Sequence, residues 1–500
     1  MLKQVLQVVL LQLILSFFSV TLVAQEVKEN KDSVALPKKK GLFGEIGKSL
    51  NKETQEILPV RIANPFIKYT GKTIRKIDIV RLGFERNIYD TTIIKNNYGV
   101  IIANGIHKKT KIKVTYNNLF FKSGDQVQPY LLADNERYLR DQIYLQDARI
   151  LIDSIPGIHD SVDVKVITKD IFPISAALII GNSSKMTLLI RDENVAGSGS
   201  RLFFGTLYDK VRNPQWGYGV EYLKRNLLGS FVDWGAIYRT YNGAINSGRG
   251  EETYLYTHFD RPLVTPFIPW IGGAAFAYRK SNNNYLTDSL YKSDYKYTSH
   301  FADVWFGYNL SNKILLYKNS GKMISKFIAV RGFYQKFSDL PDINHELYDY
   351  LYANIRGVLA SYNIFKQEAY RANFIYGFGR NEDLAEGFGA SLIGGWAVKE
   401  GRSRPYFGAQ ALRSHFSSKG FYTSYIFRVG GNLYQDRWED IDMLFNVDHF
   451  TKLKKINSQW YNRNFFSAGF ATQTRPVLDQ PLHINSVFGL PYFRGMLGYS

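Results

Sequence analysis

Residues 370–379 read YRANFIYGFG, and their character alternates from one residue to the next. Successive side chains of a β-strand point to opposite faces, so this stretch predicts a strand with one apolar, aromatic face and one small or polar face. Soluble sandwiches and membrane barrels both contain such strands, so other features of the chain must separate these two classes. The apolar face carries Tyr370, Ala372, Phe374, Tyr376 and Phe378.

Stretches of this kind follow one another from residue 173 to residue 500, separated by polar loops rich in turn-forming residues. We expect about 16 antiparallel strands, each near the roughly ten-residue length of a tilted strand that crosses a bilayer. Aromatic residues make up 15% of the chain, which is typical of the aromatic girdles of membrane barrels. These features favour a transmembrane β-barrel, with strands expected at residues 174–181, 186–191, 201–207, 216–223, 232–241, 253–259, 271–278, 301–308, 326–334, 352–361, 370–378, 388–398, 405–412, 422–434, 441–447 and 465–471.

The N-terminus has the layout of a secretory signal. Lys3 supplies the positive charge, residues 5–20 are mostly apolar, and a cleavage site follows Ala24. An uncleaved membrane anchor is the alternative, but the apolar run is short and carries glutamines, whereas a spanning helix needs about 20 apolar residues. We expect a signal peptide over residues 1–24 and a flexible linker over residues 25–65, which are rich in Lys, Glu, Asn and Ser.

Several kinds of chemistry have no residues to carry them. The chain has no cysteine, which excludes disulfides, thiolate metal sites and cysteine nucleophiles. Its eight histidines show no metal-ligand spacing, and neither a nucleophile elbow nor a phosphate-binding loop occurs. We therefore expect no enzyme activity, no cofactor and no metal. Asp436, Glu439, Asp440 and Asp442 lack the regular spacing of a calcium loop, so we expect a solvated extracellular loop there.

The formal net charge of +19 raises the question of an anionic partner. Lysine and arginine are scattered over loops and alternate strand positions, and only residues 38–40 form a tight cluster. Nucleic acid is therefore not expected. Contact with outer-membrane lipid and lipopolysaccharide is the better interpretation, and an ordinary solvated basic surface fits equally well.

Residues 66–172 differ in texture from the strand series. Residues 74–80 alternate and predict a strand, and residues 129–142 predict a helix, because Pro129 suits a first turn and apolar residues recur at helical spacing. Two more strands are expected at residues 148–152 and 162–167, with a turn between them. This order predicts a small α+β domain in front of the barrel.

Short motifs along the chain occur in a characteristic order. Residues 121–127 read FKSGDQV, the helix continues through 132–140, and residues 144–149 read YLQDAR. Residues 192–199 read DENVAGSG, which resembles an Asn-x-x-Gly-x-Gly turn after a second barrel strand. In this order the motifs resemble the outer-membrane assembly factors and two-partner secretion pores, the superfamily of BamA/TamA-like surface antigen barrels with POTRA domains. The resemblance implies a periplasmic POTRA-like domain over residues 66–172 and a barrel over residues 173–500 in the outer membrane of a Gram-negative cell.

That superfamily carries an Arg-Gly-aromatic motif on a loop folded into the barrel lumen. Two places resemble it: Arg494-Gly495 in a loop-like setting, which we favour although Met496 replaces the aromatic residue, and Arg331-Gly332-Phe333 within a strand-like pattern, the rival. A buried guanidinium needs acceptors, and Glu221 and Asp233 share strand faces with glycines that leave room for a loop. Since few residues follow Arg494, either the sequence is incomplete at its C-terminus or the barrel closes without the usual terminal strand.

The resemblance also implies a function, namely that the protein inserts or translocates polypeptide. An unfolded outer-membrane or secreted polypeptide would add a strand to the sheet edge of the POTRA-like domain, at residues 162–167 or 148–152. The barrel would then insert or pass this client. The alternative is a passive porin or a structural surface barrel, which has no evident need for the preceding α+β domain.

Overall fold

The computed structural model describes residues 64–89, 94, 98–311, 324–345, 349–373, 375, 381–457, 460–478, 482–483 and 496–497. Two sheets of very different size account for most of these residues. The predicted signal peptide and all but the last two residues of the predicted linker lie outside the described residues, as do Arg494 and Gly495.

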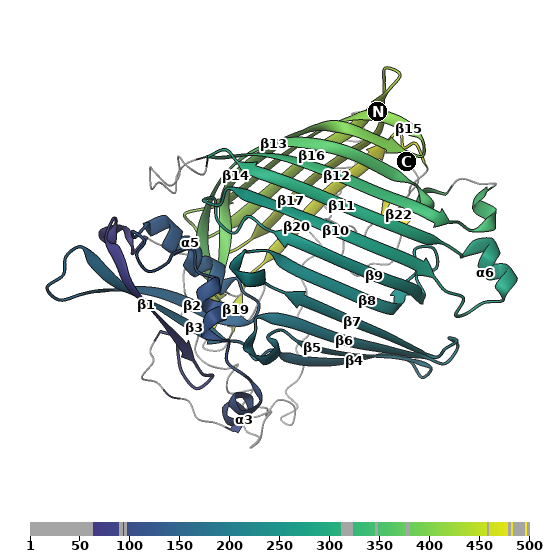
Figure 1. The fold of residues 1–500 in the computed structure, drawn as a ribbon. Coiled ribbons are helices and arrows are strands. Elements are labelled where there is room, and N and C mark those ends of the chain that lie inside the picture. Colours follow the sequence, from purple (N-terminus) through teal and green to yellow (C-terminus); the bar gives the residue numbers. More distant parts are fainter. Residues whose placement is uncertain are drawn as a thin grey trace. The chain divides into compact units, whose positions relative to one another are not determined.

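The small α+β unit contains a three-stranded sheet of β1 (Thr73–Leu82), β2 (Leu145–Ser154) and β3 (Ser161–Asp170). Its strand order is β1-β3-β2, with β1 parallel and β2 antiparallel to β3. Helix α5 (Pro129–Arg140) packs against β2, and α3 (Tyr98–Ile106) and α4 (Ile112–Asn117) precede it (Figure 1). Within the described residues, no helix is long and apolar enough to cross a membrane.

All four elements predicted for this unit are confirmed, whereas α3 and α4 were not predicted. Helix α5 begins at Pro129, whose missing N–H costs nothing in a first turn. Leu132 and Leu139 lie two turns apart on its inner face, and both are almost fully buried. They pack in one core with alternate residues of the sheet, namely Ile74, Ala148, Ile150, Val162, Val164 and Val166.

One of the two predicted sheet edges is wrong. Strand β3, which contains residues 162–167, pairs with β1 on one side and with β2 on the other, so its backbone groups are already used. Three consecutive core residues at alternate positions, Val162, Val164 and Val166, match this central place. The edge available on this side of the sheet is β2, which contains the other predicted segment, residues 148–152.

The large sheet is antiparallel and has fifteen strands. Strands that follow one another along the chain are neighbours in the sheet, from β4 to β17, and β20 pairs with β17. Figure 1 shows it as one curved ribbon of strands. β4 and β20 form its two edges, and no described strand pairs them, so the described sheet is not closed. Its strands are β4 (Ile174–Asn182), β5 (Lys185–Asp192), β6 (Ser200–Asp209), β7 (Trp216–Lys224), β8 (Asp233–Gly243), β9 (Gly250–Arg261), β10 (Trp270–Ser281), β11 (Thr298–Asn309), β12 (Ser325–Asp339), β13 (Ile355–Asn373), β14 (Asn381–Lys399), β15 (Arg402–Phe416), β16 (Tyr422–Tyr434), β17 (Arg437–Phe450) and β20 (Phe465–Thr474).

The described sheet has one strand fewer than the expected number of about 16, because β13 covers two predicted strands. The stretch between residues 361 and 370 has no glycine or proline to turn the chain, and β14 pairs with β13 without interruption along its whole length. Tyr370 and Ala372 lie at the end of β13 and pack in a buried cluster with Phe416. The residues beyond them in the stretch 370–379 fall, apart from Ile375, outside the described residues.

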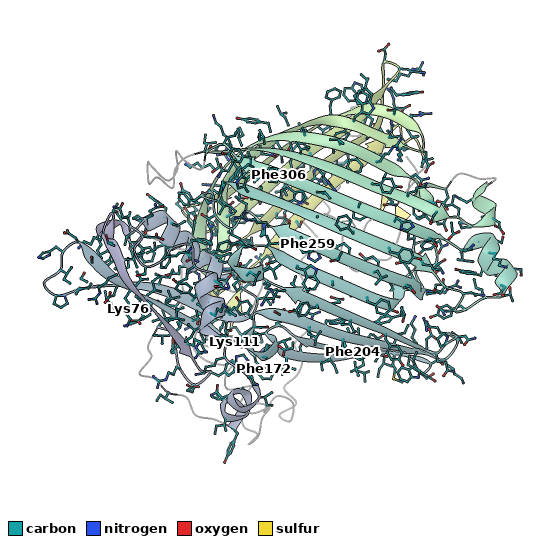
Figure 2. The ribbon with its side chains drawn as sticks, viewed as in Figure 1. Lys76, Lys111, Phe172, Phe204, Phe259 and Phe306 are labelled. Atoms are coloured by element: carbon teal, nitrogen blue, oxygen red, sulfur yellow. The ribbon has the colours of Figure 1, made fainter. Side chains whose placement is uncertain are left out.

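The two faces of the large sheet differ sharply in chemistry. On one face, which we call the apolar face, every one of the fifteen strands exposes at least one large apolar side chain. Phe204, Phe259 and Phe306 in Figure 2 belong to it. One such residue from each strand in turn is Leu178, Leu188, Phe204, Tyr218, Tyr238, Leu255, Phe276, Phe306, Val330, Val358, Leu392, Phe407, Phe427, Phe445 and Phe470.

The segments that connect β8 to β9, β10 to β11 and β12 to β13 pack together with the end of β12. Tyr297, Phe337 and Tyr352 form an aromatic cluster there, with ring centroids 5.5 to 6.3 Å apart. Asn246 Nδ2 donates to the Tyr352 hydroxyl at 2.6 Å, and the Tyr297 hydroxyl donates to Glu252. Burial raises the pKa of Tyr352 to about 12, and burial next to the Glu252 carboxylate raises the pKa of Tyr297 as well.

The cluster is expected to weaken in alkali. A phenol ionises near pH 10 in an unfolded chain, and the folded cluster keeps Tyr352 protonated to about pH 12. Folding therefore holds a proton that the unfolded chain releases, so the cluster loses stability as the pH rises from about 10 to 12. Difference absorbance of tyrosinate in wild-type protein and Tyr352→Phe measures this. The difference between the two titrations should appear near pH 12, and a difference that appears near pH 10 would contradict the prediction.

Candidate functional site

The small α+β unit contacts several turns at one end of the large sheet. Asn226, in the β7–β8 turn, makes two hydrogen bonds to the small unit. Its Nδ2 donates to Asn117 O at 2.8 Å and to Asn118 Oδ1 at 2.9 Å, beside α4. Its Oδ1 accepts from Phe231 N at 2.7 Å and thereby closes its own turn. Asn226 has φ of 46°, a left-handed conformation that asparagine adopts more readily than most residues.

Two further turns of the large sheet hold the small unit. In the β5–β6 turn, Asn194 Nδ2 donates to Thr110 Oγ1 at 2.8 Å, and Thr110 donates in turn to Asp170. In the β9–β10 turn, Thr265 Oγ1 donates to Asp134 of α5 at 2.7 Å. These contacts and those of Asn226 place α5 and α4 against three separate turns.

Arg140, the last residue of α5, makes the strongest link to the large sheet. Its Nε and Nη2 donate to Asp383 Oδ2 of β14 at 2.9 and 2.7 Å, and its Nη1 donates to Glu136 Oε1 at 2.6 Å. Only 5% of the Arg140 side chain and 3% of the Asp383 side chain are exposed. Burial alone would lower the pKa of Arg140, but the charges of Asp383 and Glu136 outweigh it and raise that pKa.

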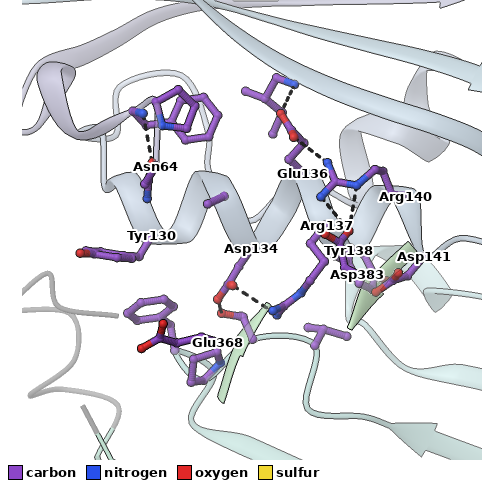
Figure 3. A pocket seen from close by; sticks show the side chains of 18 of the residues that line it. Asn64, Tyr130, Asp134, Glu136, Arg137, Tyr138, Arg140, Asp141, Glu368 and Asp383 are labelled. Carbon is purple, nitrogen blue, oxygen red and sulfur yellow. Dashed lines mark hydrogen bonds and ion pairs between the residues drawn. The ribbon is translucent and has the colours of Figure 1, made fainter. Parts of the chain in front are cut away.

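A cavity of about 1540 Å³ lies beside this link (Figure 3). One wall is formed by α5 and by residues 149–153 of β2. The opposite wall contains residues 263–267 of the β9–β10 turn and residues near the ends of β13 and β14, among them Glu368 and Asp383. The cavity therefore joins an edge strand of the small unit to the end of the large sheet, and its volume exceeds that of a pocket for a small ligand.

Side chains form hydrogen bonds with the backbone groups along the outer edge of β2. Ile150 N donates to Glu136 Oε2 at 2.9 Å, and Ile152 O accepts from the Tyr69 hydroxyl at 3.3 Å. Ala148 N donates to the carboxylate of Asp147 at 2.8 Å. The outward backbone groups of alternate β2 residues therefore bond to side chains instead of to another strand. Proteins protect a sheet edge in this way.

The rival motif of the sequence analysis lies in a strand and not in a loop. Arg331 and Phe333 lie in the middle of β12 on the polar face, opposite to the apolar face, and Gly332 lies on the apolar face. Arg331 Nε donates to Asp303 Oδ1 of the neighbouring strand at 2.9 Å. The favoured residues Arg494 and Gly495 lie outside the described residues, so the structure gives no place for either.

The two predicted partner carboxylates lie on the polar face, as the alternation predicts. Glu221 forms an ion pair with Arg239 across β7 and β8, and Asp233 accepts from Asn226 N at 2.8 Å. Neighbouring glycines make room for large side chains on this face: a Cβ at Gly219 would lie 2.9 Å from the Arg239 side chain. The sequence indicated the face of these carboxylates but could not indicate that each already has a partner.

Of the acidic residues around Asp440 that we expected in a solvated loop, only Asp436 lies in an exposed turn. Glu439 and Asp440 lie in β17, and the almost fully buried Arg404 donates to both, at 2.9 and 2.7 Å. Arg402 donates to Glu439 at 2.7 Å, and Lys399 lies 3.7 Å from Asp440. Positive residues of β14 and β15 therefore neutralise the acidic ones across the sheet. Among the described residues, no group of His, Asp and Glu is arranged to hold a metal ion.

Comparison with known proteins gives little. No family model matches the sequence, and no curated protein matches it. The chain aligns with the structure of BamA from Haemophilus ducreyi lacking POTRA domains 1–3 at 10% identity, over 80% of this chain and 85% of that one, with a TM-score of 0.30. It aligns with CdiB from Acinetobacter baumannii at 9% identity, over 87% of each chain, with a TM-score of 0.31. Both TM-scores are too low to establish a shared fold or a shared function.

Asn226 offers a test of how the small unit is held. Asn226→Ala removes the hydrogen bonds to Asn117 and Asn118 and leaves a residue with a Cβ at φ of 46°, whereas Asn226→Gly removes the same hydrogen bonds but tolerates that φ. We expect both variants to lose amide protection in residues 115–119 by hydrogen exchange. Asn226→Ala should lose about 1 kcal/mol more than Asn226→Gly. Unchanged protection in both variants would show that other contacts hold the unit.

Proposed function

We propose that this protein is an outer-membrane β-barrel that inserts or translocates polypeptide clients, and that the small α+β unit, a POTRA-like domain in the periplasm, captures them. The observation that carries the membrane assignment is the apolar face, to which all fifteen strands contribute exposed large apolar side chains. An exposed apolar surface of this extent is costly in water and is the surface that lipid requires.

The other face supports the same proposal. It carries ion pairs such as Arg239–Glu221 and Arg331–Asp303, which an aqueous lumen tolerates and a lipid environment does not. Closure of β4 against β20, directly or through further strands, would complete the pairing of backbone groups that lipid demands. The formal net charge of +19 favours contact with anionic lipid and lipopolysaccharide.

Client capture is proposed at the edge of β2. An edge strand can accept one strand of an unfolded polypeptide through backbone hydrogen bonds, which do not depend on the client sequence. The cavity of about 1540 Å³ beside β2 gives space for such a strand next to the end of the large sheet. A passive porin or a structural surface barrel is the alternative, and it leaves both the edge and the adjoining cavity without a role. No residue set in this proposal performs a covalent reaction, so we propose no enzyme activity.

The membrane assignment predicts unequal tolerance of arginine at two adjacent positions of β14. Leu392 lies on the apolar face and is 66% exposed, whereas Ser391 lies on the polar face. Leu392→Arg should lower the free energy of unfolding in lipid by about 2–4 kcal/mol, while Ser391→Arg should have little effect. Heat-modifiable gel mobility after membrane fractionation measures both. Equal tolerance of arginine at the two positions, or recovery of the wild-type chain as a soluble protein, would overturn the assignment.

Capture at β2 predicts the effect of proline at its edge. Ile150 N points away from β3, so the N–H of Ile152, two residues further on, points to the same outer edge. Ile152→Pro removes this donor without breaking the β2–β3 ladder, and Ile152→Ala loses only side-chain packing. Insertion of a urea-unfolded outer-membrane β-barrel polypeptide into liposomes should be about tenfold slower for Ile152→Pro than for Ile152→Ala. Equal rates would favour the porin or the structural alternative.

A further inference from the structure

The edge of β2 and the attachment of the small unit to the large sheet share one carboxylate, that of Glu136. Its Oε2 accepts from Ile150 N of β2 at 2.9 Å, and its Oε1 accepts from Arg140 Nη1 at 2.6 Å. Arg140 donates through its other nitrogens to Asp383 of β14. Figure 3 shows Arg140 between Glu136 and Asp383, with these bonds dashed. Ile150 N, Glu136, Arg140 and Asp383 therefore form one continuous chain of hydrogen bonds between the two sheets.

Glu136 Oε2 stands where the carbonyl oxygen of an added strand would stand. An antiparallel or parallel partner of β2 would place a carbonyl within hydrogen-bond distance of Ile150 N, and at present a carboxylate oxygen of α5 fills that position. Glu136 Oε2 already accepts from Ile150 N, so a strand cannot pair with this N–H while Glu136 remains there. A client strand and Glu136 must compete for the same donor.

Displacement of Glu136 has a consequence at Arg140. Once a client carbonyl takes Ile150 N, Glu136 Oε2 loses this donor and can turn toward Arg140, four residues further along the same helix. A guanidinium prefers to bind both oxygens of one carboxylate. Additional hydrogen bonds from Arg140 to Glu136 therefore replace hydrogen bonds from Arg140 to Asp383. The ion pair that joins α5 to β14 becomes weaker as a result.

We propose that Glu136 is a displaceable cap on the edge of β2, and that a client strand which displaces it loosens the attachment of α5 to β14 through Arg140. The occupant of the edge is an extended polypeptide strand, recognised by its backbone. The proposal rests on the proposed capture of clients at β2 and adds the coupling between that edge and the large sheet. Because such coupling is reciprocal, weakening the Arg140–Asp383 pair must in turn strengthen client binding.

The test measures the binding of one defined peptide to the full chain in detergent. The peptide copies β7, residues 216–224, with a fluorescent label, and a control peptide carries N-methyl groups on alternate amides so that it cannot pair. Asp383→Asn keeps the shape of the side chain but removes its charge, so that Glu136 is the stronger acceptor left to Arg140. We expect Asp383→Asn to bind the peptide about 5- to 20-fold more tightly than wild type.

A double-mutant cycle separates coupling from a general loosening of the protein. Glu136→Ala removes the cap and should itself tighten peptide binding. In the Glu136→Ala background, Asp383→Asn should change the affinity by less than about twofold, because the link between the two sites is missing. An equal effect of Asp383→Asn with and without Glu136 would overturn the proposal.

A second measurement follows the attachment directly. The chain has no cysteine, so Ile143→Cys and Leu310→Cys, at two exposed positions, introduce the only spin-label sites. Peptide binding should lengthen or broaden the distance between the labels, and Glu136→Ala should abolish this response. Binding of the peptide with unchanged label distance and no dependence on Asp383 would overturn the coupling and leave client capture intact. Absence of peptide binding even in Glu136→Ala would overturn client capture at β2 and the coupling together.

Discussion

The pairing register of fifteen neighbouring strands is the constraint on which the rest of this structure depends. Side chains alternate along each strand, so a shift of one residue between any two strands would move an entire set of apolar residues to the other face. The facing of side chains is kept from β4 to β20 although some strand pairs shift register locally: Leu178 and Phe470 lie at opposite edges of the sheet and on the same face. The apolar face therefore arises from a choice that is repeated consistently at every strand pair.

The opposite face shows what such a register allows. Charged residues can be placed there only if partners from adjacent strands meet them, and the pairs Glu221–Arg239 and Asp303–Arg331 each join neighbouring strands. Arg404 with Glu439 and Asp440 extends the same solution over β15, β16 and β17. Removing one member of the buried group would leave an unpaired charge at a cost of about 3–5 kcal/mol, so these groups also hold the strands in register.

The sequence predicted features that depend on neighbouring residues and missed contacts between residues that lie far apart along the chain. Alternation and turn residues are local, and they located the four elements of the α+β unit and the strands of the large sheet, with one false boundary inside β13. The acidic group around Asp440 was misread because its partners lie more than 30 residues away, on a strand that only the fold brings near. Arg140 and Asp383 are 243 positions apart, and no periodicity connects them. The choice of β2 over β3 as the edge likewise required the strand order, which alternation does not contain.

The attachment of the α+β unit combines two kinds of contact with different consequences. Asn226 and Asn194 join it to turns through neutral hydrogen bonds that involve no backbone group of β2, so these contacts fix its position. Arg140 differs, because its carboxylate neighbour Glu136 also occupies a backbone donor of the edge strand. The neutral contacts can remain when the edge of β2 exchanges Glu136 for another partner. The ion pair of Arg140 with Asp383 cannot, because Arg140 also binds Glu136. The unit can therefore stay on the large sheet through its asparagines while α5 responds to whatever pairs with β2, and this division of roles follows from the placement of a single shared carboxylate.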